Sequence, residues 1–338
     1  MRKQALLLLV VLFFVTSAAY AETDASQRRN QAPDKRIADP DRRIADLERE
    51  VGNLKRDLGF YKIPAMPVVL TLCGKSIPLA NEDVRERFER EFFQILEDRG
   101  LLTILVKRYA KYQALIFEET SRAGLPSDLI YLAVTESYLN PRSVSKANAG
   151  GMWQFIRETG KREGLALNDS IDERFSIARS TRSALGYLKK LHEEFGDWLL
   201  AMAAYNCGEG RIREVLSNQG TRDFFELYLP EETERYILRM AAVKEIISNA
   251  PKYGLSVDQK DQYKPFMVQE FFMEVKRDVH TSALAQSMDL PYRTFRELNL
   301  HLRKYVLPKG TYHLYVPSEK KDLFLRRIKE SPAVTIQQ

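Results

Sequence analysis

Cysteine is scarce in this sequence, which excludes a fold held together by many disulfides. Only Cys73 and Cys207 occur among the 338 residues, whereas disulfide scaffolds carry several pairs in a short chain. One disulfide and two free thiols are both compatible with the sequence. Neither cysteine has the histidine partner or the ligand spacing that would indicate a nucleophile or a zinc site.

Histidine is nearly as rare, and a nucleic-acid recognition motif is absent. The net charge of +6 is spread along the chain, which favours adhesion to a polyanionic wall or a lipid surface over nucleic-acid binding. The histidines are scattered without the spacing of metal ligands, so we expect no metal and no organic cofactor. They are His192, His280, His301 and His313.

Long apolar runs are absent except near the N-terminus. Basic residues 2–3 precede an apolar run over 5–15, and small residues at 19 and 21 follow it, the pattern of a signal peptide over residues 1–21. A retained membrane anchor is the alternative, although the run is shorter than the ~20 residues that span a bilayer. No cysteine stands at the cleavage point. We therefore expect an exported protein of the periplasm or cell envelope without a lipoprotein anchor.

Residues 22–80 offer little from which to build a core. Residues 22–43 are charged and poor in large apolar side chains, which predicts a disordered linker. Residues 44–80 predict a short heptad helix and then a strand-like connector over 68–73. Two heptads do not decide between packing onto the chain's own domain and a weak dimer contact. The heptad positions are Ile44, Leu47, Val51, Leu54 and Leu58.

Residues 81–254 lack the alternating apolar pattern of strands, and we predict a mainly α fold for them. Asp197 is typical of a helix N-cap and Gly208 of a helix end. The periodicity predicts helices over 81–96, 101–123, 127–138, 174–195, 197–206, 210–218 and 231–248.

One of these helices carries a carboxylate on its apolar stripe. A glutamate near a helix end is more often solvated, but burial without a cationic partner raises the pKa of a carboxyl, and Glu136 could then act as a general acid. Pro141 ends the helix about one turn later, so this side chain can open into a cleft. The stripe follows the i, i+3, i+4, i+7 spacing of one helix face and consists of Leu129, Leu132, Ala133 and Glu136.

Three further segments carry candidate binding residues. The glycine pair at 150–151 lets the backbone approach a ligand closely. After it, Gln154 could hydrogen-bond a ligand such as a sugar, and Trp153 could stack on its ring, although tryptophan is more often a core residue. Tyr205 shares one helix face with Trp198, Ala201 and Met202, so a packed core tyrosine is the alternative to a site residue. The segment 230–236 opens a helix with acidic residues, which alone indicates only an acidic first turn.

Together these segments resemble the lytic transglycosylases of bacterial cell walls, and most closely their membrane-bound D group. The resemblance covers about residues 125–254. The residues that carry it, in order, are Glu136-Ser137, Asn140-Pro141, Ser145, Gly151-Met152-Trp153-Gln154-Phe155, Ala204-Tyr205-Asn206, Gly208, Glu232-Thr233 and Tyr236.

The resemblance implies a lysozyme-like helical catalytic domain over residues 81–254. Such enzymes cleave the β-1,4 bond between N-acetylmuramic acid and N-acetylglucosamine in peptidoglycan. One glutamate, here Glu136, protonates the departing oxygen and then takes the proton of the C6 hydroxyl, so that a 1,6-anhydro ring closes without water. This single-acid scheme fits the sequence, because no second acid is an obvious partner, whereas ordinary glycosidases use two carboxylates.

The resemblance also assigns roles to other residues. It implies that Tyr205 is the direct partner of Glu136. Cys207 stands where the family often has a smaller residue, which suggests redox sensitivity, and the lipidated cysteine of the D group is missing, which puts membrane attachment in doubt. The implied substrate-binding residues are Ser145, Gln154, Tyr205, Asn206 and Trp153, with Glu232 and Tyr236 as weaker candidates.

The C-terminal part resembles a LysM module over residues 265–318, followed by a tail over 319–338. We expect helices at 282–288 and 292–298 and a strand at 309–317. The resemblance implies binding to glycans that contain N-acetylglucosamine, but the usual Gly-Asp-Thr is replaced by Val279-His280-Thr281. A degenerate module that only packs against the catalytic domain is the alternative.

Two other functions remain open at the level of sequence. A muramidase of the same fold would hydrolyse the same bond and leave no anhydro ring. A catalytically inactive scaffold would bind the wall without cleaving it. Peptidoglycan is the expected partner in all three cases.

Overall fold

The computed structural model describes residues 40–57 and 64–337, in two units that divide after Ala65. The predicted signal peptide and nearly all of the predicted linker lie outside the described residues. In the first unit, α2 spans Pro40–Asp57 and covers the predicted heptad positions as far as residue 54. Ile44, Leu47 and Val51 are about half exposed on this helix.

The second unit starts with a short hairpin of β1 (Thr71–Leu72) and β2 (Lys75–Ser76) and continues as a helical body, which confirms the predicted mainly α fold. All seven predicted helices are present. Helix α6 was not expected, because its sequence has no apolar periodicity. The helices are α3 (Glu82–Glu97), α4 (Arg99–Ala123), α5 (Ile130–Ser137), α6 (Arg157–Arg162), α7 (Ile177–Phe195), α8 (Trp198–Cys207), α9 (Glu209–Gln219) and α10 (Glu231–Ser248).

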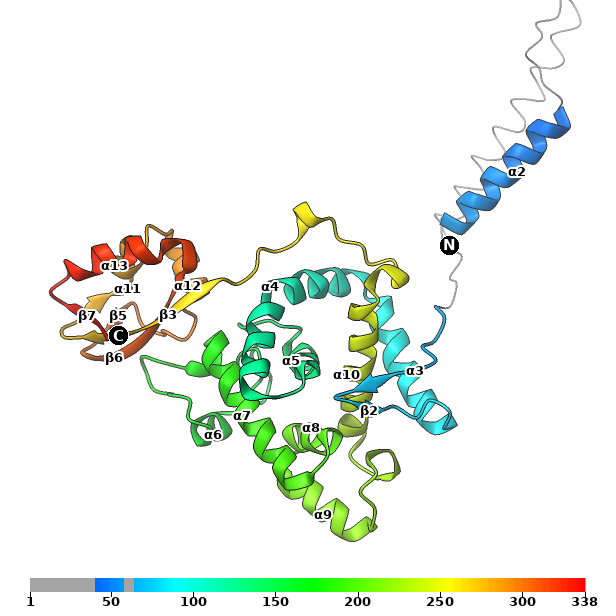
Figure 1. Cartoon of the computed structure of the whole chain (residues 1–338), viewed down its shortest axis with the longest axis horizontal. Coiled ribbons are helices and arrows are strands. Elements are labelled where there is room, and N and C mark those ends of the chain that lie inside the picture. The colour runs from blue at the N-terminus through cyan, green and yellow to red at the C-terminus, as the bar shows by residue number, and fades with distance from the viewer. Residues whose placement is uncertain (1–39, 58–63, 338) are drawn as a thin grey trace, which may run out of the picture. The chain divides into compact units, whose positions relative to one another are not determined.

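Helix α5 is buried among longer helices. It packs against α4 and α10, and α10 also packs against α3 and α8 (Figure 1). The predicted apolar stripe is confirmed, since Leu129, Leu132 and Ala133 have no exposed surface. The core around α5 therefore fixes the position of the one carboxylate on that stripe.

The chain turns sharply between α7, α8 and α9. Gly196 ends α7 in the left-handed conformation, and the Asp197 carboxylate then accepts hydrogen bonds from the first amides of α8, which confirms the predicted N-cap. Gly208 ends α8 at a φ of 89°. These caps set the direction of α8, whose last residues face the site described below.

The C-terminal module is an antiparallel sheet covered by short helices. Strand β3 (Val268–Val275) is central and pairs with β6 (Gly310–Pro317) and β7 (Val334–Gln337). Helices α11 (Thr281–Ser287) and α12 (Tyr292–Leu298) and strand β6 confirm the elements predicted there. The short strands β4 (Val279–His280) and β5 (Val306–Leu307) pair with each other.

The residues predicted as a tail are part of this module. Helix α13 (Lys321–Lys329) contributes Phe324 and Ile328 to the module core, and β7 follows it as an edge strand of the sheet. The sequence analysis missed both because the helix is short and the strand has only four residues. The module therefore extends past residue 318 to 337.

The module packs directly against the helical body through buried polar groups. Nη2 of Arg182 lies 2.6 Å from the Glu270 carboxylate, and the hydroxyls of Ser176 and Tyr315 are 2.7 Å apart. Ser176 also contacts the ring of His313. This packing is what the degenerate-module alternative predicts, while glycan binding by the module stays a prediction.

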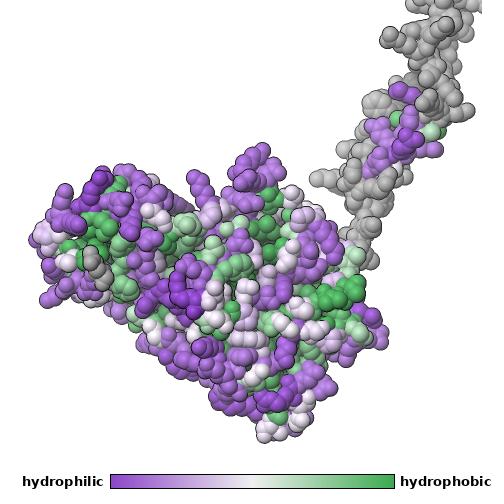
Figure 2. All heavy atoms as spheres, in the orientation of Figure 1, coloured by the Kyte–Doolittle hydropathy of each residue, from purple (hydrophilic) through white to green (hydrophobic). Residues whose placement is uncertain are grey.

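The face of the molecule shown in Figure 2 is mostly hydrophilic, with apolar residues in separate patches. The connector before β1 carries two strongly exposed apolar side chains, since Val68 and Val69 are 93% and 76% exposed. The predicted strand in this connector forms only from Thr71 onward. None of the helices in the described ranges is long and apolar enough to cross a membrane.

Candidate active site

Glu136 is the penultimate residue of α5. The helix ends at Ser137 because the next two residues, Tyr138 and Leu139, both have φ of 53°, a conformation that cannot continue a right-handed helix. The hydroxyl of Ser137 donates a hydrogen bond of 2.7 Å to the carbonyl of Met152. The end of α5 is thereby tied to the glycine-containing loop.

The carboxyl of Glu136 is bound by a tyrosine from α10. Tyr236 is buried, and its hydroxyl donates a hydrogen bond of 2.5 Å to Oε1 of Glu136. The pKa of Glu136 is raised to about 7, chiefly by burial. The hydrogen bond from Tyr236 and the charge of Arg239 lower this pKa, and the charge of Glu232 raises it. Glu136 can therefore hold a proton near neutral pH, as the sequence analysis predicted for a buried acid.

A cavity of about 560 Å³ opens beside this carboxyl. It is lined by the end of α5, the loop before α6, and the facing ends of α8 and α9, so residues far apart in the sequence meet there. Its lining includes six of the predicted site residues, namely Glu136, Ser145, Gln154, Tyr205, Asn206 and Glu232.

The loop at the cavity edge depends on one glycine. Gly151 has a φ of +82°, and a Cβ placed there would lie 1.8 Å from the carbonyl oxygen of Arg174. No other residue fits without moving that backbone. The buried guanidinium of Arg174 in turn donates to the carbonyls of Asn148 and Phe155, on both arms of the loop. The close approach predicted for the glycine pair is therefore to the protein's own chain.

Gln154 and Ser145 stand at the cavity as predicted. Gln154 has a φ of 49°, and its amide nitrogen donates to the carbonyls of Ser143 and Gly151. Those bonds fix the side chain at the cavity wall. The hydroxyl of Ser145 accepts a hydrogen bond from the amide of Ala149.

Tyr205 is not the direct partner of Glu136, and that prediction is wrong. Its hydroxyl donates a hydrogen bond of 2.8 Å to the carbonyl of Trp153, whereas the tyrosine that contacts the acid is Tyr236. Sequence spacing could not rank the two tyrosines, since which of them reaches the acid depends on how α8 and α10 pack.

Trp153 is a core residue, so its predicted stacking on a sugar ring is also wrong. The side chain has no exposed surface, and its indole nitrogen donates a hydrogen bond of 2.9 Å to the hydroxyl of Thr181. A core position was the alternative that the sequence left open for this tryptophan.

Asn206 and Glu232 both line the cavity. Oδ1 of Asn206 accepts a hydrogen bond of 3.0 Å from the hydroxyl of Thr233, which joins the end of α8 to the start of α10. The charge of Glu232 raises the pKa of Glu136. No second acid was an obvious partner from the sequence, and the structure places Glu232 in the lining of the same cavity as Glu136.

Several cavity residues were missed from the sequence. Arg162 from α6, Tyr187 from α7 and Glu209 from α9 form one cluster, in which the Tyr187 hydroxyl donates a hydrogen bond of 2.8 Å to Glu209 and Arg162 forms an ion pair with the same carboxylate. No sequence signal identifies them, because each looks like an ordinary polar surface residue.

Both cysteines are free thiols. Cys207 lines the cavity, and burial raises the pKa of its thiol. Cys73 lies in the turn between β1 and β2. The disulfide that the sequence left open is not formed.

Residues 114–228 match the family described as Transglycosylase SLT domain. This part of the chain is therefore similar to an SLT domain. The match includes Glu136, the glycine loop and α8, and it ends before α10. Tyr236, which donates a hydrogen bond to Glu136, is therefore on a helix outside the matched residues.

Similar proteins extend this likeness along the chain. Membrane-bound lytic murein transglycosylase D of Escherichia coli K12 is 27% identical over 263 residues, which are 76% of this chain and 56% of that protein. Membrane-bound lytic murein transglycosylase C of Histophilus somni is 28% identical over 169 residues, 45% of each chain. A putative tributyltin chloride resistance protein of Alteromonas is 35% identical over 112 residues, 33% of this chain and 54% of that protein. The chain spans just over half the length of lytic murein transglycosylase D.

Solved structures also show similarity over part of the chain. The 70 kDa soluble lytic transglycosylase of Escherichia coli aligns with a TM-score of 0.34 and 22% identity, over 45% of this chain and 26% of that one. An inactive mutant of lytic transglycosylase Slt from Pseudomonas aeruginosa aligns with a TM-score of 0.29 and 24% identity, over 46% and 26%. The assignment of the SLT domain stands on the sequence match.

Proposed function

We propose that this chain is a peptidoglycan lytic transglycosylase. It cleaves the β-1,4 bond between N-acetylmuramic acid and N-acetylglucosamine and forms 1,6-anhydro-N-acetylmuramic acid. The observation that carries the proposal is the protonatable carboxyl of Glu136 at a cavity wall, bound by Tyr236. The SLT domain match and the names of the similar proteins support the same reaction.

Glu136 serves both halves of the reaction. With a pKa of about 7 it is partly protonated at neutral pH and can protonate the departing glycosidic oxygen. It is then a carboxylate, and it accepts the proton of the muramic C6 hydroxyl as that oxygen closes the anhydro ring. The hydrogen bond from Tyr236 favours the ionised form, so it stabilises the carboxylate between the two steps.

The cavity offers polar groups for the sugar. The fixed carbonyl oxygen of Gln154 accepts a hydrogen bond from an N-acetyl or hydroxyl group, and Ser145 and Asn206 bind further hydroxyls. These roles are supported by the position of the three side chains in the cavity lining. The cluster of Arg162 and Glu209 extends the polar wall in the same cavity.

Hydrolysis is the second candidate reaction, because Glu232 lines the same cavity as Glu136. Glycosidases that hydrolyse their substrate place a second carboxylate where it can activate water or attack the sugar. The two reactions differ by one water in the product. A scaffold that binds the wall without cleaving it would release no product at all.

The deciding experiment incubates peptidoglycan sacculi with wild type, Glu136→Gln and the control Glu118→Gln, and identifies the soluble products by mass spectrometry. Glu118 is exposed on α4 and contacts Arg122 at the surface. We expect anhydro-muropeptides from wild type and from the control, and none from Glu136→Gln. Products one water heavier would indicate hydrolysis. If none of the three folded proteins releases a soluble product, the chain is a scaffold that binds the wall without cleaving it.

We propose that the enzyme is exported and works in the periplasm or at the envelope. The signal-peptide pattern and the membrane-bound relatives support this location. The proposed domains are the catalytic body over 81–254 and the C-terminal module from 265, which binds glycan if its resemblance to LysM extends to function. Sequencing the N-terminus of the secreted protein and measuring sacculus binding after removal of residues 265–338 test these proposals.

A further inference from the structure

A buried carboxylate on α3 binds two arginines that flank the tyrosine of the active site. Glu91 is only 1% exposed, and its two oxygens accept hydrogen bonds from Nε of Arg235 and Nε of Arg239. Both arginines are on α10, one residue before and three residues after Tyr236. Glu91 lies outside the residues that match the SLT domain.

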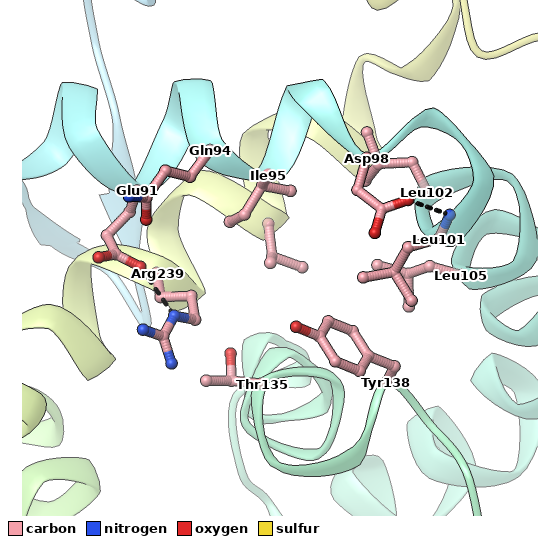
Figure 3. A pocket seen from close by; sticks show the side chains of 11 residues that line it. Glu91, Gln94, Ile95, Asp98, Leu101, Leu102, Leu105, Thr135, Tyr138 and Arg239 are labelled. Carbon is pink, nitrogen blue, oxygen red and sulfur yellow. Dashed lines mark hydrogen bonds and ion pairs between the residues drawn. The ribbon is translucent and has the colours of Figure 1, made fainter.

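Arg239 lines the same cavity as Thr135, the residue that precedes Glu136. Its charge lowers the pKa of Glu136, so its guanidinium is within electrostatic reach of that carboxyl. Figure 3 shows the terminal nitrogens of Arg239 directed away from Glu91, toward the side where Thr135 lies. Among the described residues, only Nε of Arg239 has a hydrogen-bond partner, so Glu91 alone holds the group in place.

A second cavity leaves the guanidinium room to move. It has a volume of about 330 Å³ and is lined by Glu91, Arg239, Tyr138 and Thr135, among others (Figure 3). Thr135 immediately precedes Glu136, and its buried hydroxyl has no hydrogen-bond partner among the described residues. No packed side chain therefore fixes Arg239 on this side.

We propose that Glu91 is a positioning residue, which binds Arg239 and holds its charge back from Glu136 so that the catalytic carboxyl keeps its proton. The inference rests on the proposed role of Glu136 as the acid. It also gives a function to the buried ion pair of Glu91 and Arg239, which the proposed mechanism does not otherwise use.

The sign of the effect follows from the charges that face Glu136. From α10 these groups are Glu232, Tyr236 and Arg239, and from α8 the facing group is Tyr205. Loss of the negative charge of Glu91 leaves Arg239 unneutralised, which favours the carboxylate of Glu136. Loss of Arg239 has the opposite effect, because it removes the positive charge that favours the carboxylate.

The test measures the titration of Glu136 directly, in full-length protein with ¹³C-labelled glutamate carboxyls. The signal of Glu136 is the one missing in Glu136→Gln. In Glu91→Gln we expect its midpoint to fall by about half a pH unit or more. In Arg239→Gln we expect it to rise, and the double variant should follow Arg239→Gln, since the effect of Glu91 acts through Arg239.

Glu119→Gln is the matched control. Glu119 is also a buried carboxylate between two arginines, Arg122 and Arg182, but it is not among the groups that face Glu136. We expect a similar loss of stability without a change in the Glu136 midpoint. If Glu91→Gln does not fold, Glu91→Asp replaces it, and its retracted carboxylate should give a smaller shift in the same direction.

An unchanged midpoint in folded Glu91→Gln, or a shift of the same sign in Glu91→Gln and Arg239→Gln, overturns the proposal. The pH profile of product release gives a second readout, in which the alkaline limb should move with the midpoint. If wild type releases no product at any pH, the proposed function fails, while the titration still decides whether Glu91 controls Glu136.

Discussion

The hydroxyl of Tyr236 reaches Oε1 of Glu136 across 100 positions of sequence, at a distance of 2.5 Å. The bond joins the first turns of α10 to the end of α5. It fixes the carboxyl group of Glu136, a residue that also lines the cavity.

Tyr236→Phe should impair catalysis and shift the pH profile upward. The hydrogen bond lowers the pKa of Glu136, so its removal raises that pKa, and the alkaline limb of the activity profile moves to higher pH. We expect kcat to fall roughly tenfold, because the carboxylate formed after the first step loses a hydrogen bond. The control is Tyr253→Phe, which removes a similar tyrosine–glutamate bond to Glu245 and should leave the profile in place.

Glu136→Gln should stabilise the protein at alkaline pH. The folded state raises the pKa of Glu136 from 4.5 to about 7, so it binds more protons than the unfolded chain over that interval, and stability falls as pH rises through it. The full penalty above pH 7 is about 3 kcal/mol. Chemical denaturation should therefore show a higher free energy of unfolding for Glu136→Gln than for wild type at pH 8. At pH 4, where the carboxyl is protonated in both states, the variant should show no such gain.

Gly151→Ala should disrupt the loop at the cavity edge. The added Cβ would collide with the carbonyl of Arg174 and the residue would keep a positive φ, so we expect a loss of about 3 kcal/mol or more in the free energy of unfolding. Gly164→Ala separates the two causes, because Gly164 has a φ of +85° and open space around it. It should cost only about 1 kcal/mol. Equal costs for the two variants would contradict the steric argument.

Thr181→Val should weaken folding without weakening binding to the glycan. It leaves the buried indole nitrogen of Trp153 without an acceptor, which costs about 1–3 kcal/mol. Since Trp153 does not face the cavity, sacculus binding at a temperature where the variant is folded should match wild type. A selective loss of binding would restore the tryptophan as a substrate contact.

The sequence predicted the helices and the acid well because both leave local signals. Helices α7 and α8 are delimited by Gly196, Asp197 and Gly208, and the stripe around Glu136 repeats at helical spacing within one segment. The choice between Tyr205 and Tyr236 was not predictable, because it depends on the packing of α8 and α10 against α5. The inward turn of Trp153 and the role of Glu91 are likewise properties of the packed structure.

The position of α10 sets a limit on how the protein can be cut. A fragment that ended with the matched SLT residues at 228 would still contain Glu136 and the glycine loop. It would lack Tyr236, and the faces of α5 and α8 that pack on α10 would be exposed to water. The smallest autonomous piece that retains the acid and its partner must therefore run on through Ser248, and it must also begin early enough to include α3, which packs against that helix.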